Sequence, residues 1–261
     1  MAKREIQDCR AILTGASSGI GRALAVELAR RDAKLVAVAR RAERLQELAA
    51  EVAAAGRSIE TVAGDVSDPA VRQQALDAAM AHFGGLDLLV NNAGIGAMGL
   101  FEHADPQRLR RVMEVNFFAL VEMTRLCLPQ LKQGRRPMIV NVSSILGHRG
   151  VPHSSEYSAS KFAVQGFSEA LRAELAQHGV EVLVVSPGTT ETEFFERVIE
   201  RTSSPKWPEH KPVSPAYVAQ QVVRGIRRGQ HEVIPYRWGK VLCWLNRLSP
   251  GLVDRLMQRY A

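Results

Sequence analysis

The chain has 261 residues, 46% of them hydrophobic, which is enough apolar material for one large α/β domain without a second. The net charge of +7 is modest, and the basic residues lie among Asp and Glu without a stripe of interleaved aromatic residues, so nucleic-acid binding is not expected. Three widely separated cysteines, and the lack of Cys/His groups with metal-ligand spacing, argue against a disulfide framework and a metal site.

Strand-like and helix-like segments alternate along the chain. Apolar runs predict strands at 10–14, 34–39, 59–63, 87–91, 137–142 and 181–185, with a last one at 231–234. Helical spacing of apolar residues predicts helices at about 19–31, 41–55, 69–83, 107–132, 156–178 and 215–229. Runs such as 35–38 are apolar without alternation, which is typical of strands covered on both faces. The pattern predicts a doubly wound parallel sheet with ligands at the carboxyl ends of its strands.

A glycine-rich turn follows the first expected strand. The sequence Thr14-Gly15-Ala16-Ser17-Ser18-Gly19-Ile20-Gly21 leads from the apolar run into a segment with helical spacing. Glycines adopt backbone angles closed to other residues and leave no Cβ between the main chain and a bound pyrophosphate. The following helix directs its free N–H groups at the same phosphates. The turn is a candidate dinucleotide site, although taken alone it is equally consistent with a tight loop.

Two arginines, Arg40 and Arg41, end the second expected strand. In dinucleotide-binding folds an Asp or Glu at this place accepts hydrogen bonds from the ribose hydroxyls and repels the 2′-phosphate of NADP. A guanidinium instead pairs with a phosphate through two parallel hydrogen bonds. The arginines therefore favour NADP(H). The alternative interpretation is that they only begin a solvated helix.

The next two strands end in turn-forming residues. Asp65-Val66 follows the third strand, and Asn91-Asn92-Ala93-Gly94 follows the fourth. Asn, Asp and Gly are the usual turn residues, so each motif alone is consistent with an ordinary turn. Their regular succession at the ends of neighbouring strands favours a role at the ligand-binding edge of the sheet.

Tyr157 and Lys161 carry the candidate chemistry. They are four residues apart on an expected helix, so their side chains share one face. A tyrosine has an ordinary pKa of about 10 and is protonated at neutral pH. The neighbouring ammonium and the positive ring of an oxidised nicotinamide would lower that pKa. Tyr157 could then donate a proton to a carbonyl oxygen as hydride reaches the carbon, or accept one from an alcohol.

Ser144 and Asn116 are the other two candidates. Ser144 ends the strand at 137–142, where its hydroxyl can bond a substrate oxygen, and Asn116 lies on the helix at 107–132, where it can bond main chain and water. A buried Ser or Tyr taken singly is often only a hydrogen-bonded core group. The four residues together favour a catalytic set in which protons pass through Lys161 to solvent.

The order and separation of these motifs are specific. With Ser143-Ser144 after the strand, the run Tyr157-Ser158-Ala159-Ser160-Lys161 and the later Ser186-Pro187-Gly188, the chain resembles the short-chain dehydrogenase/reductase family over roughly residues 8–195. The resemblance implies a Rossmann-type sheet, NADP(H) as cofactor and a catalytic tetrad of Asn116, Ser144, Tyr157 and Lys161. It also implies a set of cofactor-binding residues: Gly15, Ser17, Ser18, Gly19, Ile20, Gly21, Arg40, Arg41, Asp65, Val66, Asn92, Ala93, Gly94, Tyr157, Lys161, Pro187, Gly188, Thr190 and Thr192.

The substrate region is less legible. Residues 189–214 form a long irregular stretch, which in compact domains is usually a lid or a binding loop. Met98, Leu100, Phe194 and Phe195 could line an apolar pocket or belong to the core. The loop residues His148, Arg149 and His153 lie where relatives shape the pocket, but as histidines in a loop the two His are more simply interpreted as surface residues.

The carboxyl end forms a separate unit in this interpretation, with residues 1–236 as the catalytic domain and 237–261 as a helical extension. Apolar residues repeat at helical spacing on both sides of Ser249-Pro250, which resembles a cap and first turn. We expect two short amphipathic helices that pack on the domain or on a second subunit, with a membrane surface as the alternative. The resemblance implies a homo-oligomer, a dimer more than a tetramer, joined through the helices at 107–132 and 156–178.

The function predicted is an NADP-dependent carbonyl reductase or alcohol dehydrogenase acting on a small, lipophilic substrate. An epimerase that uses the same tetrad, and a non-enzymatic cofactor-sensing or membrane-associated protein, are the alternatives. The amino terminus lacks the apolar core of a signal peptide, and no apolar run approaches the roughly 20 residues of a membrane span, so a cytoplasmic location is expected, with peripheral membrane contact as an addition.

Overall fold

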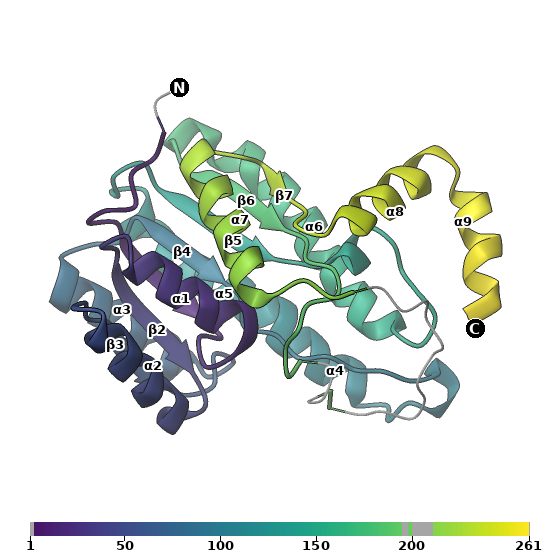
Figure 1. Ribbon diagram of the computed structural model, residues 1–261, viewed down its shortest axis with the longest axis horizontal. Helices are drawn as coiled ribbons and strands as arrows, with labels where there is room; N and C mark the ends of the chain where they lie inside the picture. Colours follow the sequence, from purple (N-terminus) through teal and green to yellow (C-terminus); the bar gives the residue numbers. More distant parts are fainter. Residues whose placement is uncertain (1–2, 195–197, 200–210, 261) are drawn as a thin grey trace.

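The computed structural model describes residues 3–194, 198–199 and 211–260. Within them, seven parallel strands form one sheet in the order β3-β2-β1-β4-β5-β6-β7 (Figure 1). The strands are β1 (Arg10–Thr14), β2 (Lys34–Ala39), β3 (Glu60–Ala63), β4 (Leu88–Asn91), β5 (Met138–Val142), β6 (Glu181–Val185) and β7 (Glu232–Val233). The predicted Rossmann-type doubly wound sheet is confirmed, and the carboxyl ends of its strands share one edge.

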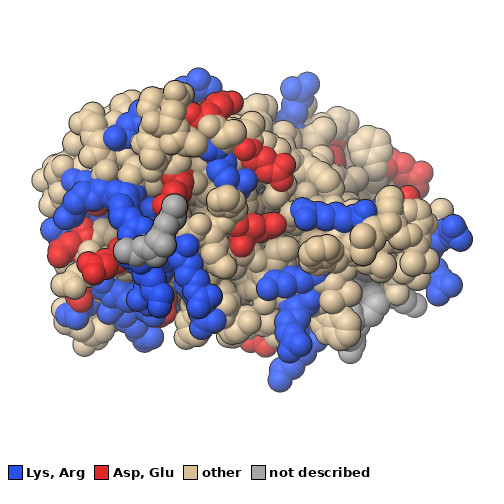
Figure 2. Space-filling model, turned by 90° about the horizontal axis from the view of Figure 1, so that it is seen from above, with Lys and Arg blue, Asp and Glu red and all other residues tan. Residues whose placement is uncertain are grey.

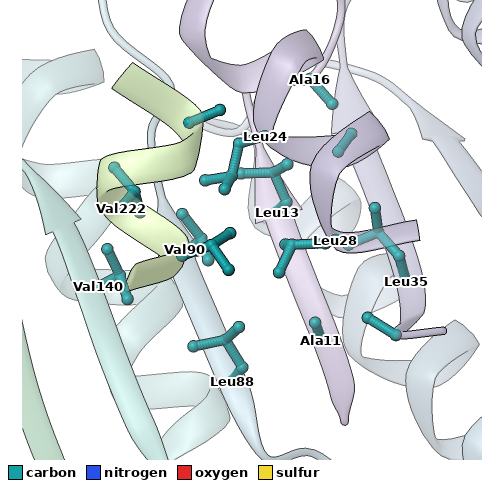
Figure 3. Packing of buried hydrophobic residues seen from close by; sticks show 14 of the residues in the cluster. Ala11, Leu13, Ala16, Leu24, Leu28, Leu35, Leu88, Val90, Val140 and Val222 are labelled. Carbon is teal, nitrogen blue, oxygen red and sulfur yellow. The ribbon is translucent and has the colours of Figure 1, made fainter. Parts of the chain in front are cut away.

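Helices cover both faces of the sheet. They are α1 (Gly19–Ala29), α2 (Ala42–Ala54), α3 (Pro69–Phe83), α4 (Arg108–Met113), α5 (Ala119–Leu131), α6 (Ser155–Leu175) and α7 (Pro215–Arg228). Side chains of α1, α2 and α7 share one apolar core with the sheet, and those of α3, α5 and α6 share the other. Figure 3 shows Leu24 and Leu28 of α1 against Leu13 of β1, with Val222 of α7 beside them. Alternate residues of each central strand enter opposite cores, which explains their unbroken apolar runs.

The helix predicted at 107–132 is interrupted. A turn of π-helix at Glu114–Phe118 separates α4 from α5, and Asn116 lies in it, almost fully buried. Apolar periodicity cannot reveal such a turn because one inserted residue leaves the helix continuous. Turns of this kind are frequent at functional sites, where they redirect one side chain.

Two further helices, α8 (Arg237–Leu248) and α9 (Pro250–Met257), follow β7 and project from the body of the protein (Figure 1). We call residues 237–260 the arm. Pro250 occupies the first turn of α9 as predicted, but the Ser249 side chain makes no capping hydrogen bond. Among the described residues, no helix has both the length and the apolar character needed to cross a bilayer.

The basic side chains visible from above gather around the amino-terminal end of the chain (Figure 2). Arg135 and Arg136 donate hydrogen bonds there to the carbonyls of Asp8 and Lys3. This is the end of the sheet where β1 and β5 begin.

Candidate active site

The turn between β1 and α1 is built around glycines that cannot be replaced without a clash. Gly15 has a φ of +71°, and a Cβ at Gly21 would lie 2.1 Å from the Gly15 carbonyl oxygen. The Asn92 amide donates to the carbonyls of Thr14 and Gly15 at 3.0 and 3.1 Å, and the Thr14 hydroxyl accepts from the Asn92 and Ala93 N–H groups at 3.1 Å. The Asn-Ala-Gly motif after β4 thus holds the glycine turn in place.

Ser17, Ser18, Gly19 and Ile20 are half-buried at the start of α1. The N–H groups of a first helical turn have no partner within the helix and favour an anion. Ser18 is extended at the N-cap, and its side chain makes no capping bond. The turn therefore presents its main chain to the edge of the sheet.

The two arginines after β2 differ in their surroundings. The Arg41 guanidinium lies within 3.4 Å of the Ser17 hydroxyl and 3.1 Å from the Glu193 carboxylate. Arg40 extends into solvent, with its side chain 67% exposed and 3.9 Å from Asp65. The sequence analysis gave both arginines the same role, but only Arg41 contacts the glycine turn.

Asp65 and Val66 follow β3 as predicted. The Asp65 carboxylate accepts bonds from the Ser67 N–H and hydroxyl groups at 3.0 and 2.8 Å, and Val66 is buried. The Asp65 side chain is therefore shared between Ser67 and Arg40.

The side chains of Asn116 and Lys161 both approach Gly94. Asn116 accepts from the Ile95 N–H at 2.8 Å and donates to the Ile95 carbonyl and the Ser160 hydroxyl at 3.0 Å. The Lys161 ammonium donates to the Val142 carbonyl at 2.9 Å. A Cβ at Gly94 would lie 3.2 Å from Asn116 Oδ1 and 3.6 Å from Lys161 Nζ. Both side chains thus reach the same point under the Asn-Ala-Gly turn.

Tyr157 lies one turn before Lys161 on α6, with the Lys161 ammonium 5.7 Å from its ring centre. Burial raises the pKa of Tyr157 to about 12, and a hydrogen bond with Ser144 opposes this rise. Burial also lowers the pKa of Lys161 to about 8. The expected lowering of the Tyr157 pKa is not found in this structure, because burial raises that pKa more than the Ser144 hydrogen bond lowers it, and the hydroxyl stays protonated.

The neighbours of these side chains are fixed by tertiary contacts. Glu156, just before Tyr157, forms a buried ion pair with Arg108 of α4. Ser144 ends the extended chain after β5; its hydroxyl accepts from the Leu146 N–H at 3.1 Å and lies 3.5 Å from the Pro187 carbonyl. The strand ends of β5 and β6 are thus held beside the start of α6.

The segment after β6 lies across the site. Gly188 packs against the ring of Tyr236, Thr190 is buried and donates to the Gly188 carbonyl at 3.0 Å, and a Cβ at Gly19 would lie 2.9 Å from the Thr192 methyl. Phe194 stands 5.6 Å from Tyr157, ring centre to ring centre. Consecutive residues of this segment therefore contact the glycine turn, Arg41 and Tyr157.

Most of the substrate loop predicted at 189–214 lies outside the described residues, as does Phe195. Met98, Leu100 and Phe194 are half-buried, which places them at the border of the core. Val213, Tyr217, Pro235, Tyr236 and Trp238 line an open hollow of about 310 Å³ beyond Gly188, together with Ser214 and Arg237.

The surface assignment of His148 is wrong. Its ring lies 2.6 Å from the Glu232 carboxylate and 3.2 Å from the Ser186 hydroxyl, with the side chain only 7% exposed. Burial raises the Glu232 pKa, but the hydrogen bonds with His148 and Ser186 and the charges of His148 and Arg247 together lower it overall. His153 is also not at the open surface; it is half-buried, and its carbonyl accepts from Gly99 at 2.9 Å.

Comparison with known proteins identifies the family. A family model described as short chain dehydrogenase matches residues 10–203. The chain belongs to the short-chain dehydrogenase/reductase family. It is 34% identical to the bovine "Dehydrogenase/reductase SDR family member 7B" over 97% of this chain and 81% of that protein. It is 38% identical to "11-beta-hydroxysteroid dehydrogenase-like 4A" of Arabidopsis thaliana, over 93% and 81%.

Solved structures of short-chain dehydrogenase/reductases share the fold. One from Burkholderia phymatum in complex with NAD has a TM-score of 0.87 at 26% identity, covering 95% of this chain and 96% of that one. One from Burkholderia cenocepacia in complex with NADP has a TM-score of 0.83 at 28% identity, covering 97% and 99%. As a member of the short-chain dehydrogenase/reductase family, the protein is an oxidoreductase that uses NAD or NADP.

Proposed function

We propose that the protein reduces the carbonyl group of a lipophilic substrate with NADPH, and can oxidise the corresponding alcohol with NADP. The observation that carries the proposal is the grouping of Ser144, Tyr157 and Lys161 at the carboxyl ends of the strands, beside the glycine turn. The catalytic set is Asn116, Ser144, Tyr157 and Lys161. The roles of these residues rest on the family resemblance together with this geometry.

The residues present fit a nicotinamide dinucleotide. The glycine turn and the first turn of α1 offer free N–H groups to a pyrophosphate, and Arg41 beside Ser17 offers a cation to a 2′-phosphate. Asp65 and Val66 lie near the expected adenine side, and Pro187, Gly188, Thr190 and Thr192 on the nicotinamide side. When bound, the cofactor supplies or accepts the hydride.

The protein's own groups handle the proton. A hydroxyl whose pKa burial raises to about 12 is protonated at neutral pH, which is the form that donates a proton to a carbonyl oxygen. Ser144, hydrogen-bonded to Tyr157, is placed to hold the substrate oxygen. Lys161 keeps a charge beside the Tyr157 ring. Asn116 holds the turn at Gly94 and Ile95 next to Lys161. Protons can therefore return from solvent to Tyr157 through Lys161.

The preference for NADPH is testable through Arg41. Replacing Arg41 with Ala should weaken NADPH binding by about tenfold or more, because a charge-assisted bond is worth about 1.5–3 kcal/mol and each 1.4 kcal/mol is tenfold. NADH binding should change little. Arg40→Ala should cause a smaller loss because the Arg40 side chain is 67% exposed. Fluorescence titration of both cofactors measures these affinities.

Arg44→Ala is the matched control for that experiment. Arg44 lies on α2 in an exposed pair with Glu47 at 3.2 Å, so its removal should leave both affinities unchanged. Equal affinity of the wild-type protein for NADPH and NADH, or an unchanged preference in both Arg40→Ala and Arg41→Ala, would sink the assignment of NADP.

The substrate class is inferred from apolar surroundings. The half-buried Phe194 stands 5.6 Å from Tyr157, ring centre to ring centre, and the half-buried Met98 and Leu100 flank Gly99, whose N–H donates to the His153 carbonyl in the loop before Tyr157. The 310 Å³ hollow beyond Gly188 has largely apolar walls. Relatives named as hydroxysteroid dehydrogenases support a lipophilic ketone or secondary alcohol. A turnover screen that pairs apolar and small ketones with NADPH tests this inference, with faster turnover expected for the apolar ones.

We also propose a homo-oligomer, a dimer in the first place. Phe118, just before α5, and Phe162 of α6 expose 49% and 46% of their surface on the long helices expected to meet a second subunit. Phe162→Ser should therefore lower the mass measured by light scattering. An unchanged mass above that of one chain would place the subunit contact elsewhere.

A further inference from the structure

The arm presents a second apolar face that the described chain does not cover. Val241, Trp244 and Leu248 of α8 expose 54, 64 and 77% of their surface, and their spacing places them along one side of the helix. Leu252 and Leu256 of α9 add exposures of 44 and 36%. We call these five side chains the arm face. A run of large exposed apolar residues of this kind marks an interaction surface.

The opposite side of α8 is already occupied. Gly239 packs so closely on Ile145 that a Cβ there would lie 2.7 Å from its side chain, and Cys243 is 4% exposed. The Asn246 amide donates to the His148 carbonyl at 3.1 Å. Because α8 is seated on the loop after Ser144 by this side, the arm face points away from its own domain.

Arginine contacts hold the arm in this orientation. Arg149 donates to Asn246 at 3.1 Å and forms an ion pair with Asp254 of α9 at 2.7 Å. The Arg149 side chain of the loop thus contacts both α8 and α9. The arm face is consequently presented in a fixed position relative to the loop that leads from Ser144 to Tyr157.

The charges of the arm identify the chemistry of its partner. Five basic residues accompany the arm face, all of them exposed: Arg237, Lys240, Arg247, Arg255 and Arg259. Asp254 is the only acidic residue of the arm, and Arg149 is bound to it. Indole and leucine side chains flanked by Lys and Arg are the composition of helices that lie in the interface of an anionic membrane.

A second copy of the chain is a poorer partner for the same face. A symmetric dimer contact sets the same patch of each subunit against itself. The arm's basic residues would then face one another with little acidic compensation, and like charges brought together at an interface weaken it. Anionic headgroups neutralise them instead.

We propose that the arm face binds the surface of a bilayer containing anionic lipid. Trp244 and Leu248 enter the interface, and Lys240 and Arg255 contact lipid phosphates. This binding does not depend on the proposed oxidoreductase activity. If that activity is as proposed, the arm also holds the Ser144 loop near the lipid, on the side from which an apolar substrate would arrive.

Vesicle sedimentation tests the proposal with the full-length protein. Wild-type protein should sediment with vesicles of phosphatidylcholine and phosphatidylglycerol, less with phosphatidylcholine alone, and less again at high salt. The double variant Trp244→Ser/Leu248→Ser should lose at least about tenfold in partitioning, because two large apolar side chains no longer enter the interface. Phe101→Ser, at a residue 70% exposed on the main domain, should behave as wild type.

Charge reversal provides the second part of the experiment. Lys240→Glu/Arg255→Glu should reduce binding to the anionic vesicles and leave binding to phosphatidylcholine unchanged. Arg135→Glu, at a side chain 68% exposed at the opposite end of the molecule, should have little effect. The proposal is overturned if wild-type protein stays in the supernatant, or if Trp244→Ser/Leu248→Ser partitions as wild type. It is also overturned if that double variant dissociates an oligomer in light scattering without lipid, which would assign the arm face to a second subunit.

Discussion

Replacing Tyr157 with Phe is expected to slow ketone reduction by about a hundred- to ten-thousandfold, the usual contribution of a positioned proton donor. The change removes only the hydroxyl and keeps the ring, which packs 5.6 Å from Phe194, centre to centre. The fold and the glycine turn stay intact, so NADPH binding should change little. Single-turnover measurement of NADPH oxidation, alongside a fluorescence titration of NADPH, separates the two quantities.

Ser158→Ala is the control for Tyr157→Phe. The Ser158 hydroxyl is the next one along α6, and it is buried without a hydrogen-bond partner. Removing it takes away a hydroxyl of the same helix without breaking a bond, so turnover should stay near that of the wild type. Near-normal turnover in Tyr157→Phe would refute the role of Tyr157 as proton donor.

Lys161→Met is expected to abolish turnover and weaken NADPH binding while the protein becomes no less stable. Lys161 is 4% exposed, and burial lowers its pKa from 10.5 to about 8. A lowered pKa means that folding disfavours the charged form, by about 3 kcal/mol at neutral pH for a shift of this size. Methionine has a similar volume and no charge, so the melting temperature should hold or rise. Such a trade of stability for activity is typical of functional sites.

The same pKa predicts a pH dependence. Lys161 is charged below about pH 8 and loses its proton as the pH rises through that value. Ketone reduction should therefore decline above about pH 8, if the charge beside Tyr157 is required. A kcat/KM profile for Lys161→Arg, whose guanidinium stays charged, should lack this decline in whatever activity remains. For Lys161→Met, a lower melting temperature would contradict the expected stability, and retained turnover would contradict the catalytic role of Lys161.

The sheet and the glycine turn were predictable because their causes are local. Apolar runs without alternation, such as 35–38, require cover on both faces wherever they occur. Gly21 follows a strand at the spacing that lets the chain turn back on itself, and the structure shows its missing side chain against Gly15. Each of these features is marked by a short stretch of sequence, so one sequence is enough to identify it.

Other features depend on partners distant in the sequence. The π-helical turn at Asn116 is accompanied by bonds to Ile95 and Ser160, which no helical periodicity contains. His148 is buried because Glu232, 84 residues away, lies beside it. Arg41, rather than Arg40, contacts Ser17, which lies 24 residues earlier in the chain. In each case the residue type could be identified in the sequence, but its partner could not.

The central claim is hydride transfer from NADPH to a carbonyl carbon, and isotope transfer tests it most directly. The full-length protein is incubated with NADPH carrying deuterium at the transferable position of the nicotinamide and with an apolar ketone, and the alcohol is analysed by mass spectrometry. The account predicts one deuterium on the carbinol carbon for each NADPH oxidised, and none with Tyr157→Phe on the same timescale. Deuterium that stays on the cofactor, with no NADPH consumed by any ketone tried, would contradict the account and favour epimerisation or a non-enzymatic role.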